Sequence, residues 1–288
     1  MSIDWDIDAP PEGRDKAFLE GILRQSSQSL FTMTEGKQML GTVYVYKNGQ
    51  FMGNTDIQYL LKDGRANASV ASFITGCKSC RVQQFAGTGE TPVDHGKTVA
   101  HEFGHYVLGL LDEYREVGGT STAPSSPQDG DTPRDTIMHN HLGFTNISTA
   151  DDYADPANRK TAQFRSTGKS AWDVLVADPS TDTINNGRIQ YQPFKNMAAP
   201  TKATLTKPTT GWENDLKIVY MGGEDSSATP KSAVATTTST PTARGPINII
   251  VIDTTMGADT LKAQINAAAQ MIDASGDSNR IAVYAHPF

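Results

Sequence analysis

Apolar and polar positions in residues 1–75 follow first a helical and then a strand pattern. Residues 14–34 predict an amphipathic helix, whose apolar face comprises Phe18, Ile22, Leu23, Leu30 and Phe31. Residues 39–46 are mostly β-branched and aromatic and predict a strand, which the Asn48-Gly49 turn closes as in a hairpin. Residues 57–61 and 68–75 predict further short strands, the second as an edge strand along which an extended peptide can pair.

The alternation of apolar and polar positions that predicts helices and strands becomes weaker after residue 114. Residues 117–134 are dense in Gly, Ser, Thr, Pro and Asp and predict a loop without a core. A short helix that places Trp172 in the core is predicted for residues 170–175. Weaker strand signals predict a small β subdomain built from residues 189–194, 203–206 and 216–221.

The last part of the chain has a different composition. Residues 225–245 are rich in Ser, Thr, Ala and Pro and predict a linker. A strand at 246–253, a helix at 260–272 and a strand at 280–284 then predict one β-α-β unit. Because one such unit cannot cover both faces of a parallel sheet, we expect the natural protein to continue beyond residue 288.

These patterns divide the chain into three parts. Residues 1–224 are predicted to form one domain, residues 225–245 the linker, and residues 246–288 the start of a second domain. A length of 288 residues is enough for one large domain or two ordinary ones.

Composition excludes two classes of partner. The net charge is -7 and the lysines and arginines are scattered, so we expect no nucleic-acid partner. No segment approaches the roughly 18 consecutive apolar residues of a membrane span, and the first residues lack the basic and apolar regions of a signal peptide. The cysteines are Cys77 and Cys80, for which we predict a disulfide, because no second pair exists to complete a four-cysteine zinc site.

Residues 101–114 contain the strongest chemical signal, a His-Glu-x-x-His motif. If residues 98–108 are helical, His101 and His105 lie one turn apart on the same face and can reach one metal ion. The carboxylate of Glu102 lies beside them without acting as a ligand, which suits a general base. In a mostly apolar helix these three side chains would otherwise be unpaired buried polar groups.

Asp112 is the predicted third ligand. Gly109 can end the helix in a left-handed conformation and return the chain toward the metal. Two histidines and one carboxylate leave the fourth position of a tetrahedral zinc ion open to water, as in catalytic rather than structural sites. Three alternatives for the third ligand stay open: Glu113, His139 and His141.

Other residues around the motif have secondary interpretations. Met138 is predicted to form an apolar floor beneath the metal. His95 is interpreted as a surface residue near the helix start rather than as a ligand. The acidic residues of 147–160 are interpreted as a solvated face, with calcium binding as the alternative. A glutamate ligand from a later helix is disfavoured, because only Glu213 and Glu224 follow Glu116.

Several stretches together resemble the calcium-activated chloride channel regulator (CLCA) family, in its N-terminal zinc-peptidase domain. They occur in the family's order, and the glycine of the zinc motif stands four rather than three residues after the second histidine, as in that family. The matching stretches are Ser29-Leu30-Phe31 with Thr34, residues 101–114, Thr136-Ile137-Met138, and Ser170-Ala171-Trp172-Asp173-Val174. From Ile247 the chain resembles the first β-α-β unit of the family's von Willebrand factor A domain.

The resemblance implies an α+β fold: a metzincin-like zinc peptidase domain with a long zinc-binding helix, followed by the start of an α/β von Willebrand factor A-like domain. It implies that His101, His105 and Asp112 bind zinc and that Glu102 is the catalytic base. Asp253-Thr254-Thr255-Met256-Gly257 departs from the A-domain metal motif, which puts magnesium binding there in doubt. The few cysteines suggest a microbial relative, and we expect an extracellular or periplasmic location.

The predicted function is therefore a zinc endopeptidase that acts on a protein or peptide substrate, with self-cleavage as a further expected activity. The alternative is an extracellular binding or adhesion module with a non-catalytic zinc site. Glu102 favours the peptidase, because a non-catalytic site has no use for this carboxylate.

Overall fold

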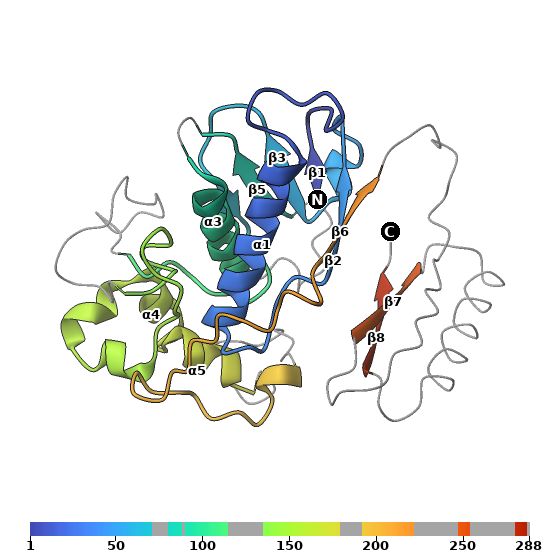
Figure 1. Ribbon diagram of the computed structural model, residues 1–288. Coiled ribbons are helices and arrows are strands. Elements are labelled where there is room, and N and C mark those ends of the chain that lie inside the picture. Colours follow the sequence, from blue (N-terminus) through green and yellow to red (C-terminus); the bar gives the residue numbers. More distant parts are fainter. Residues whose placement is uncertain are drawn as a thin grey trace. The chain divides into compact units, whose positions relative to one another are not determined.

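The computed structural model describes residues 1–70, 80–87, 90–114, 135–178, 192–221, 247–253 and 280–286 (Figure 1). The chain forms two compact units, Met1–Gly222 and Gly223–Phe288. The first unit contains all the residues of the predicted zinc motif.

A six-stranded sheet forms the centre of the first unit. Its order is β4-β5-β3-β1-β2-β6, and all neighbours are parallel except the antiparallel pair β4 and β5. The strands are β1 (Ser2–Ile3), β2 (Thr42–Tyr46), β3 (Ile57–Leu60), β4 (Asn67–Ala68), β5 (Val82–Phe85) and β6 (Lys217–Met221). The prediction of a domain that combines helices with a sheet is confirmed, as a mixed α/β arrangement with a mostly parallel sheet.

Two strand predictions were wrong. Asn48 and Gly49 do form a turn with positive φ angles of 55° and 70°, but β2 pairs in parallel with β1 and β6 and makes no hairpin. Strand β6 does not belong to a separate β subdomain: Thr42 of β2 pairs with Lys217 of β6 in the main sheet. Residues 203–206 form no strand, and residues 189–191 lie outside the described part. Local patterns cannot reveal a partner that lies so far away in the chain.

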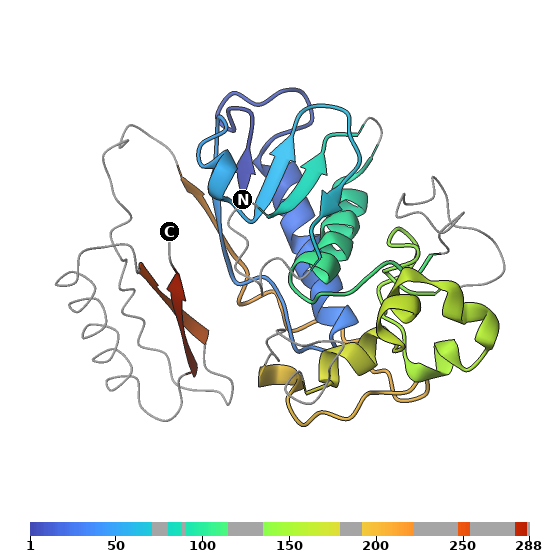
Figure 2. The same ribbon diagram turned by 180° about the vertical axis from the view of Figure 1, so that it is seen from behind.

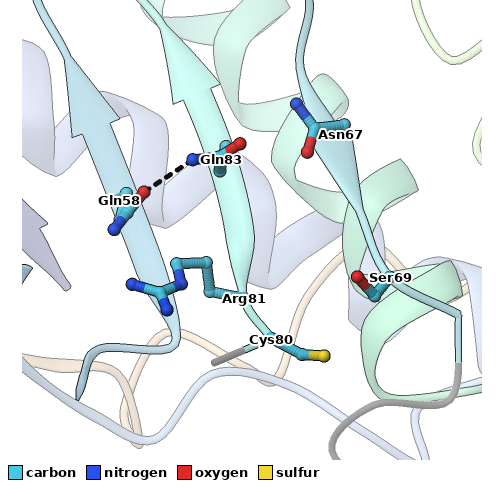
Figure 3. Close-up of a pocket in the computed structure, with 6 residues that line it drawn as sticks. All are labelled: Gln58, Asn67, Ser69, Cys80, Arg81 and Gln83. Carbon is cyan, nitrogen blue, oxygen red and sulfur yellow. Dashed lines mark hydrogen bonds between the residues drawn. The ribbon is translucent and has the colours of Figure 1, made fainter. Parts of the chain in front are cut away.

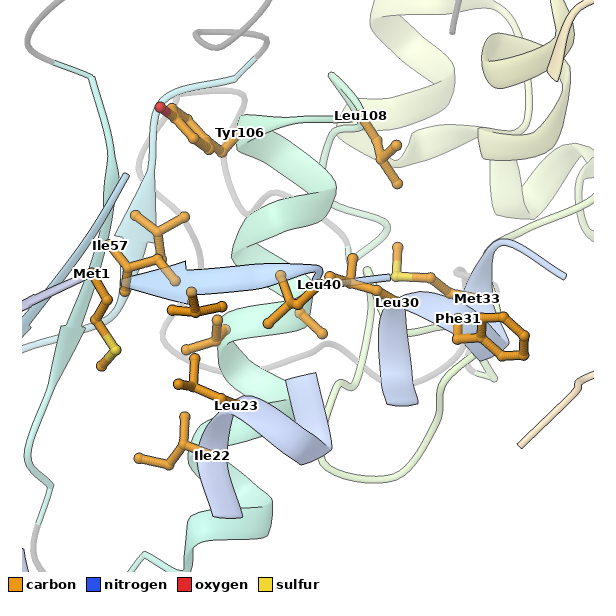
Figure 4. Packing of buried hydrophobic residues seen from close by; sticks show 14 of the residues in the cluster. Met1, Ile22, Leu23, Leu30, Phe31, Met33, Leu40, Ile57, Tyr106 and Leu108 are labelled. Atoms are coloured by element: carbon orange, nitrogen blue, oxygen red, sulfur yellow. The ribbon is translucent and has the colours of Figure 1, made fainter. Parts of the chain in front are cut away.

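Two long helices, α1 (Lys16–Met33) and α3 (Pro92–Tyr106), lie side by side and pack against the sheet (Figures 1 and 2). Helix α1 agrees with the predicted helix, and Asp15 caps it by accepting a hydrogen bond of 2.9 Å from the Phe18 amide. Figure 4 shows the apolar side chains that fill the interface, including Ile22, Leu23, Leu30 and Ile57.

The zinc-motif helix α3 begins earlier than residue 98, where the prediction placed its start. Thr91 and Asp94 form a capping box, and Pro92 occupies the first turn. These signals start the helix at Pro92, so the histidines of the motif lie in its last two turns. The additional first turns of α3, which include Pro92 and Gly96, pack against α1.

Glycines lie at close contacts between helices α1 and α3. A Cβ atom on Gly96 would lie 2.7 Å from the Ile22 carbonyl oxygen and 2.4 Å from the Gln25 Cβ. The Ser26 hydroxyl donates a hydrogen bond of 3.1 Å to the Gly96 carbonyl at the same crossing. A Cβ atom on Gly21 of α1 would lie 2.9 Å from the Pro92 Cβ. The crossing therefore fixes α3 in place along α1.

Shorter elements follow the zinc motif. They are η2 (Ala150–Tyr153), η3 (Pro156–Lys160), α4 (Ala162–Thr167), α5 (Ala171–Val176) and η4 (Gln192–Phe194); η1 (Met52–Asn54) precedes β3. Helix α5 confirms the predicted short helix, and Trp172 is fully buried against the ring of Phe194, with centroids 6.1 Å apart.

The acidic stretch at residues 147–160 gains no support as a calcium site. The ammonium of Lys202 lies 2.5 Å from the Asp152 carboxylate, and the Lys202 amide donates a hydrogen bond of 2.9 Å to Asp151. The Lys202 ammonium thus supplies the positive charge that a calcium ion would supply. Lys202 also connects the residues around position 202 to this acidic stretch.

The second unit is described in two strands, β7 (Ile247–Asp253) and β8 (Arg280–His286). They pair in parallel, with Ile247 opposite Arg280, which confirms both predicted strands. The predicted helix at 260–272, the linker at 225–245 and the motif positions 254–257 lie outside the described residues. Among the described residues of the whole chain, no helix is long and apolar enough to cross a membrane.

His95 is fully buried, so its interpretation as a surface residue was wrong. Its ring packs edge-on against Phe18 and Tyr59, with both centroid distances at 5.6 Å, and its Nδ1 lies 2.8 Å from the Gln84 amide nitrogen. Burial, with a smaller effect of the Arg14 charge, lowers the pKa of His95 to about 4. Asp94 opposes that shift, and the Glu90 carboxylate lies 3.2 Å from Nδ1.

Replacement of Gly96 by alanine is expected to destabilise the protein. The added methyl group meets a backbone carbonyl that cannot move without shifting α1, so we expect a loss of about 1–3 kcal/mol in the free energy of unfolding. Urea denaturation of Gly96→Ala measures this loss. Gly41→Ala is the control, because a Cβ atom there meets nothing within 4 Å. Equal stability of the two variants would contradict the close crossing.

Acid is expected to destabilise the protein partly through His95. Its folded pKa of about 4 lies below the ordinary value of 6.5, so its contribution is complete above pH 6.5 and is lost as the pH falls toward 4. The shift corresponds to about 3 kcal/mol. Denaturation of wild type and His95→Gln between pH 7 and 4, both with a chelator, isolates this histidine from the carboxylates. Identical pH profiles would refute the prediction.

Candidate metal centre

The turn after α3 brings the chain back to the histidines. Gly109 has a φ of 68°, the left-handed conformation that the sequence predicts. Its amide donates a hydrogen bond of 3.2 Å to the His105 carbonyl, and the Leu110 amide donates one of 2.9 Å to the Gly104 carbonyl. Residues after Gly109 therefore run back along the end of the helix and reach the two histidines.

His101, His105 and Asp112 form one compact group. One ligand atom of each lies within 4.8 Å of the other two. Nε2 of His101 is 3.4 Å from Oδ1 of Asp112, and Nε2 of His105 is 3.2 Å from the same oxygen. Both histidines are buried, and Oδ1 of Asp112 faces the two Nε2 atoms with no other partner among the described residues. The structure thus brings together the three ligands that the sequence predicts.

The histidine rings are oriented by backbone carbonyls. Nδ1 of His101 lies 2.8 Å from the Ile137 carbonyl oxygen, and Nδ1 of His105 lies 2.8 Å from the Leu110 carbonyl oxygen. Because a carbonyl only accepts hydrogen bonds, both Nδ1 atoms carry the proton. Both Nε2 lone pairs then point at a carboxylate oxygen. Three electron-pair donors that meet in one place favour a positive charge between them, either a metal ion or a proton.

The charge balance of the group also favours a cation. Burial acts to lower the pKa of His105, but the hydrogen bond and charge of Asp112 outweigh it and raise this pKa to about 9. The group therefore binds a proton tightly when nothing else neutralises Asp112. Two imidazole nitrogens and one carboxylate oxygen are a donor set that suits zinc, so the residues fit the predicted metal.

Glu102 interacts electrostatically with His101, His105 and Asp112 but is not one of the three candidate ligands. Its side chain is buried, and Oε2 has no hydrogen-bond partner within the part of the chain that the structure describes. Burial raises the pKa of the Glu102 carboxyl, and the charges of His101 and His105 partly oppose this shift. A buried carboxylate with an unused oxygen beside a metal-binding group is available to accept a proton.

Glu113, the neighbour of Asp112, points into a different environment. It is fully buried, and Oε1 accepts hydrogen bonds from the Ser148 hydroxyl and, at 3.1 Å, from the Tyr153 hydroxyl. Burial raises the pKa of Glu113 to about 7. The carboxylate that turns toward the histidines is that of Asp112.

The other two candidates for the third ligand lie outside the group as well. His139 is buried but is not part of the ligand set. The ring of His141 stacks at a tilt of 45° on His101, with centroids 5.0 Å apart, and burial lowers the pKa of His141 to about 4. His141 therefore lies beside the candidate ligands without joining them.

Met138 packs against the helix between the two histidines. It is fully buried, and a Cβ atom on Gly104 would lie 2.7 Å from its sulfur. Its carbonyl accepts a hydrogen bond of 3.0 Å from the Glu113 amide. Residues 137–138 thus support both α3 and the returning chain, and the apolar floor beneath a metal stays a prediction.

Two supporting residues were missed in the sequence. The side chain of Gln163 accepts a hydrogen bond of 2.8 Å from the Leu111 amide, and its backbone amide donates one of 3.0 Å to the Asp112 carbonyl. Ser148 donates to Glu113. No local signal marks either residue, because each acts through a partner more than 30 positions away.

A separate polar hollow of about 280 Å³ lies on the sheet, lined by Gln58, Asn67, Ser69, Cys80, Arg81 and Gln83 (Figure 3). The Gln83 amide donates a hydrogen bond of 2.8 Å to Gln58 across it. None of the metal-binding residues lines the hollow. Cys80 is disulfide-bonded, in agreement with the predicted disulfide, and Cys77 lies outside the described residues.

Comparison of the chain with protein-family models, curated proteins and solved structures found no match.

Asp112 and Glu113 are expected to respond differently to loss of charge. Asp112→Asn removes the anionic ligand, so zinc affinity should fall by more than the roughly 10- to 100-fold that a lost outer partner costs. Glu113→Gln should leave zinc affinity within about threefold of wild type and change mainly the unfolding free energy, because its partners are Ser148 and Tyr153. Competition with a chromophoric chelator measures both affinities. The reverse ranking would assign the ligand to Glu113.

Proposed function

We propose that this protein is a zinc-dependent endopeptidase. The observation that supports the proposal is the convergence of two Nε2 atoms and Asp112 Oδ1 beside the unpartnered buried oxygen of Glu102. Three ligands with a separate buried carboxylate correspond to a hydrolytic zinc site rather than a structural one, which uses four protein ligands.

The chemistry divides between the metal and the chain. When bound, zinc supplies a Lewis acid that lowers the pKa of water and polarises a peptide carbonyl. Glu102 accepts the proton of the attacking water on Oε2 and transfers it to the departing amine. Its burial raises its pKa, which makes the carboxylate a stronger base. His101 and His105 keep their orientation through the Ile137 and Leu110 carbonyls.

An edge strand beside the metal-binding helix supports a peptide substrate. Strand β4 is the outer strand of the described sheet, antiparallel to β5 and in contact with α3. Its outer edge, which pairs with no described strand, offers backbone groups to an extended peptide, as in other proteins that bind peptides by strand addition. Strand β4 (Asn67–Ala68) overlaps the predicted edge strand at residues 68–75 only at Ala68; residues 69–70 form no strand, and residues 71–79 lie outside the described residues.

The family of the peptidase domain and the type of the second domain are proposed from the sequence motifs. We propose a metzincin-like peptidase domain of the CLCA type, followed by the start of a von Willebrand factor A-like domain, and an extracellular or periplasmic location. The ordered motifs from Ser29 to Val174 support the first part, and the parallel pair β7 and β8 is compatible with the second. A binding module with a non-catalytic zinc site is the weaker proposal, since it leaves the buried Glu102 without a role.

Glu102→Gln is expected to abolish peptidase activity. The amide keeps the size of the side chain but cannot accept the proton, so the rate of casein cleavage should fall by about 100- to 10,000-fold at equal zinc content. Glu213→Gln is the control, because Glu213 is an exposed glutamate far from the motif in sequence. Equal rates for Glu102→Gln and wild type would exclude the peptidase function and leave the binding module.

A further inference from the structure

A chain of two hydrogen bonds leads from the edge of the sheet to the carboxylate of Asp112. The Tyr114 hydroxyl lies 2.7 Å from Oδ2 of Asp112, and a guanidinium nitrogen of Arg65 lies 3.1 Å from the Tyr114 oxygen. Oδ2 is the oxygen that does not face the histidines, because Oδ1 lies 3.2 Å from His105 and 3.4 Å from His101. Tyr114 thus contacts the outer side of the proposed zinc ligand.

The direction of both hydrogen bonds follows from chemistry. A guanidinium has only donors, so the Tyr114 oxygen must accept from Arg65. The single hydroxyl proton of Tyr114 is then directed to Oδ2 of Asp112, which only accepts when ionised. Arg65 therefore determines which way the tyrosine donates. Oδ2 is engaged, and Oδ1 alone remains for a cation.

We propose that Tyr114 is a positioning residue that holds Asp112 as a ligand through one oxygen, and that Arg65 locks Tyr114 in this role. The inference rests on the proposed metal site but not on peptidase activity. A carboxylate without the Tyr114 bond could rotate and present both oxygens, or turn away from the histidines. Either change alters the number or the geometry of the ligands around the metal.

Arg65 also connects this arrangement to the proposed substrate edge. It stands two residues before β4, and its carbonyl accepts a hydrogen bond of 3.0 Å from the Asn67 side chain. The same short segment thus holds the edge strand and the outer partner of Asp112.

A second tyrosine of the motif provides a matched control. The Tyr106 hydroxyl donates a hydrogen bond of 2.9 Å to the Asp56 carboxylate, outside the ligand group. Tyr106→Phe and Tyr114→Phe therefore each remove one partly buried Tyr–Asp hydrogen bond, and only Tyr114→Phe affects a proposed ligand. Their comparison separates positioning of the ligand from a general loss of stability.

The test measures metal binding rather than catalysis. Zinc affinity, measured by competition with a chelator, should be about 10- to 100-fold weaker in Tyr114→Phe and within about twofold of wild type in Tyr106→Phe. The visible absorption of the Co²⁺-substituted protein, which depends on coordination number and geometry, should change in Tyr114→Phe and remain unchanged in Tyr106→Phe. Wild-type affinity and spectrum in Tyr114→Phe would overturn the proposal.

Arg65→Met keeps the test decisive if Tyr114→Phe does not fold. Arg65 is exposed, so its replacement leaves the core intact but frees the Tyr114 hydroxyl to rotate. We expect zinc affinity to fall by about two- to tenfold, with the same change in the Co²⁺ spectrum as in Tyr114→Phe. Unchanged affinity and spectrum would show that Arg65 does not lock the tyrosine. A wild-type protein that binds zinc but cleaves no peptide would refute the proposed function and leave this inference standing.

Discussion

The convergence of two imidazole lone pairs and one carboxylate oxygen is the constraint on which the rest of this structure depends. His101 and His105 are buried and Asp112 is partly buried, so solvent screens their mutual repulsion only weakly. A metal ion or a proton relieves this repulsion, and contacts with the surrounding chain keep the side chains from turning away. Each ligand accordingly has a partner on its outer side.

The two packed helices hold the two histidines in position. Helix α3 holds both histidines on its last two turns, and its close crossing with α1 at Gly96 leaves it no freedom to shift along the sheet. The helix ends at Gly109, whose left-handed conformation sends the chain back past the histidines. A side chain at residue 96 or a different turn at residue 109 would misplace the ligands without touching them.

The segment that follows the zinc motif contacts the candidate ligands and keeps them from turning away. Its backbone supplies the Ile137 carbonyl to His101, and Met138 packs on Gly104 between the histidines. Gln163 holds the backbone of Asp112 from one side, and Glu113 is buried among Ser148 and Tyr153 on the other. The adjacent carboxylates of residues 112 and 113 thus serve opposite purposes, one as a proposed ligand and one as an anchor for this segment.

The sequence by itself determined the features that depend on neighbouring residues. The four-residue spacing of His101 and His105 places them on one helix face, and Gly109 marks the turn. Helix α1 and strands β2, β3, β6, β7 and β8 follow from their local patterns, whereas β1 and β5 were not predicted. Only the tertiary structure decided the parallel pairing of β6 with β2, the burial of His95, and the choice of Asp112 over Glu113. These outcomes depend on contacts between residues far apart in the chain. Such contacts form, and stabilise the protein, only when the sheet and its helices have packed together.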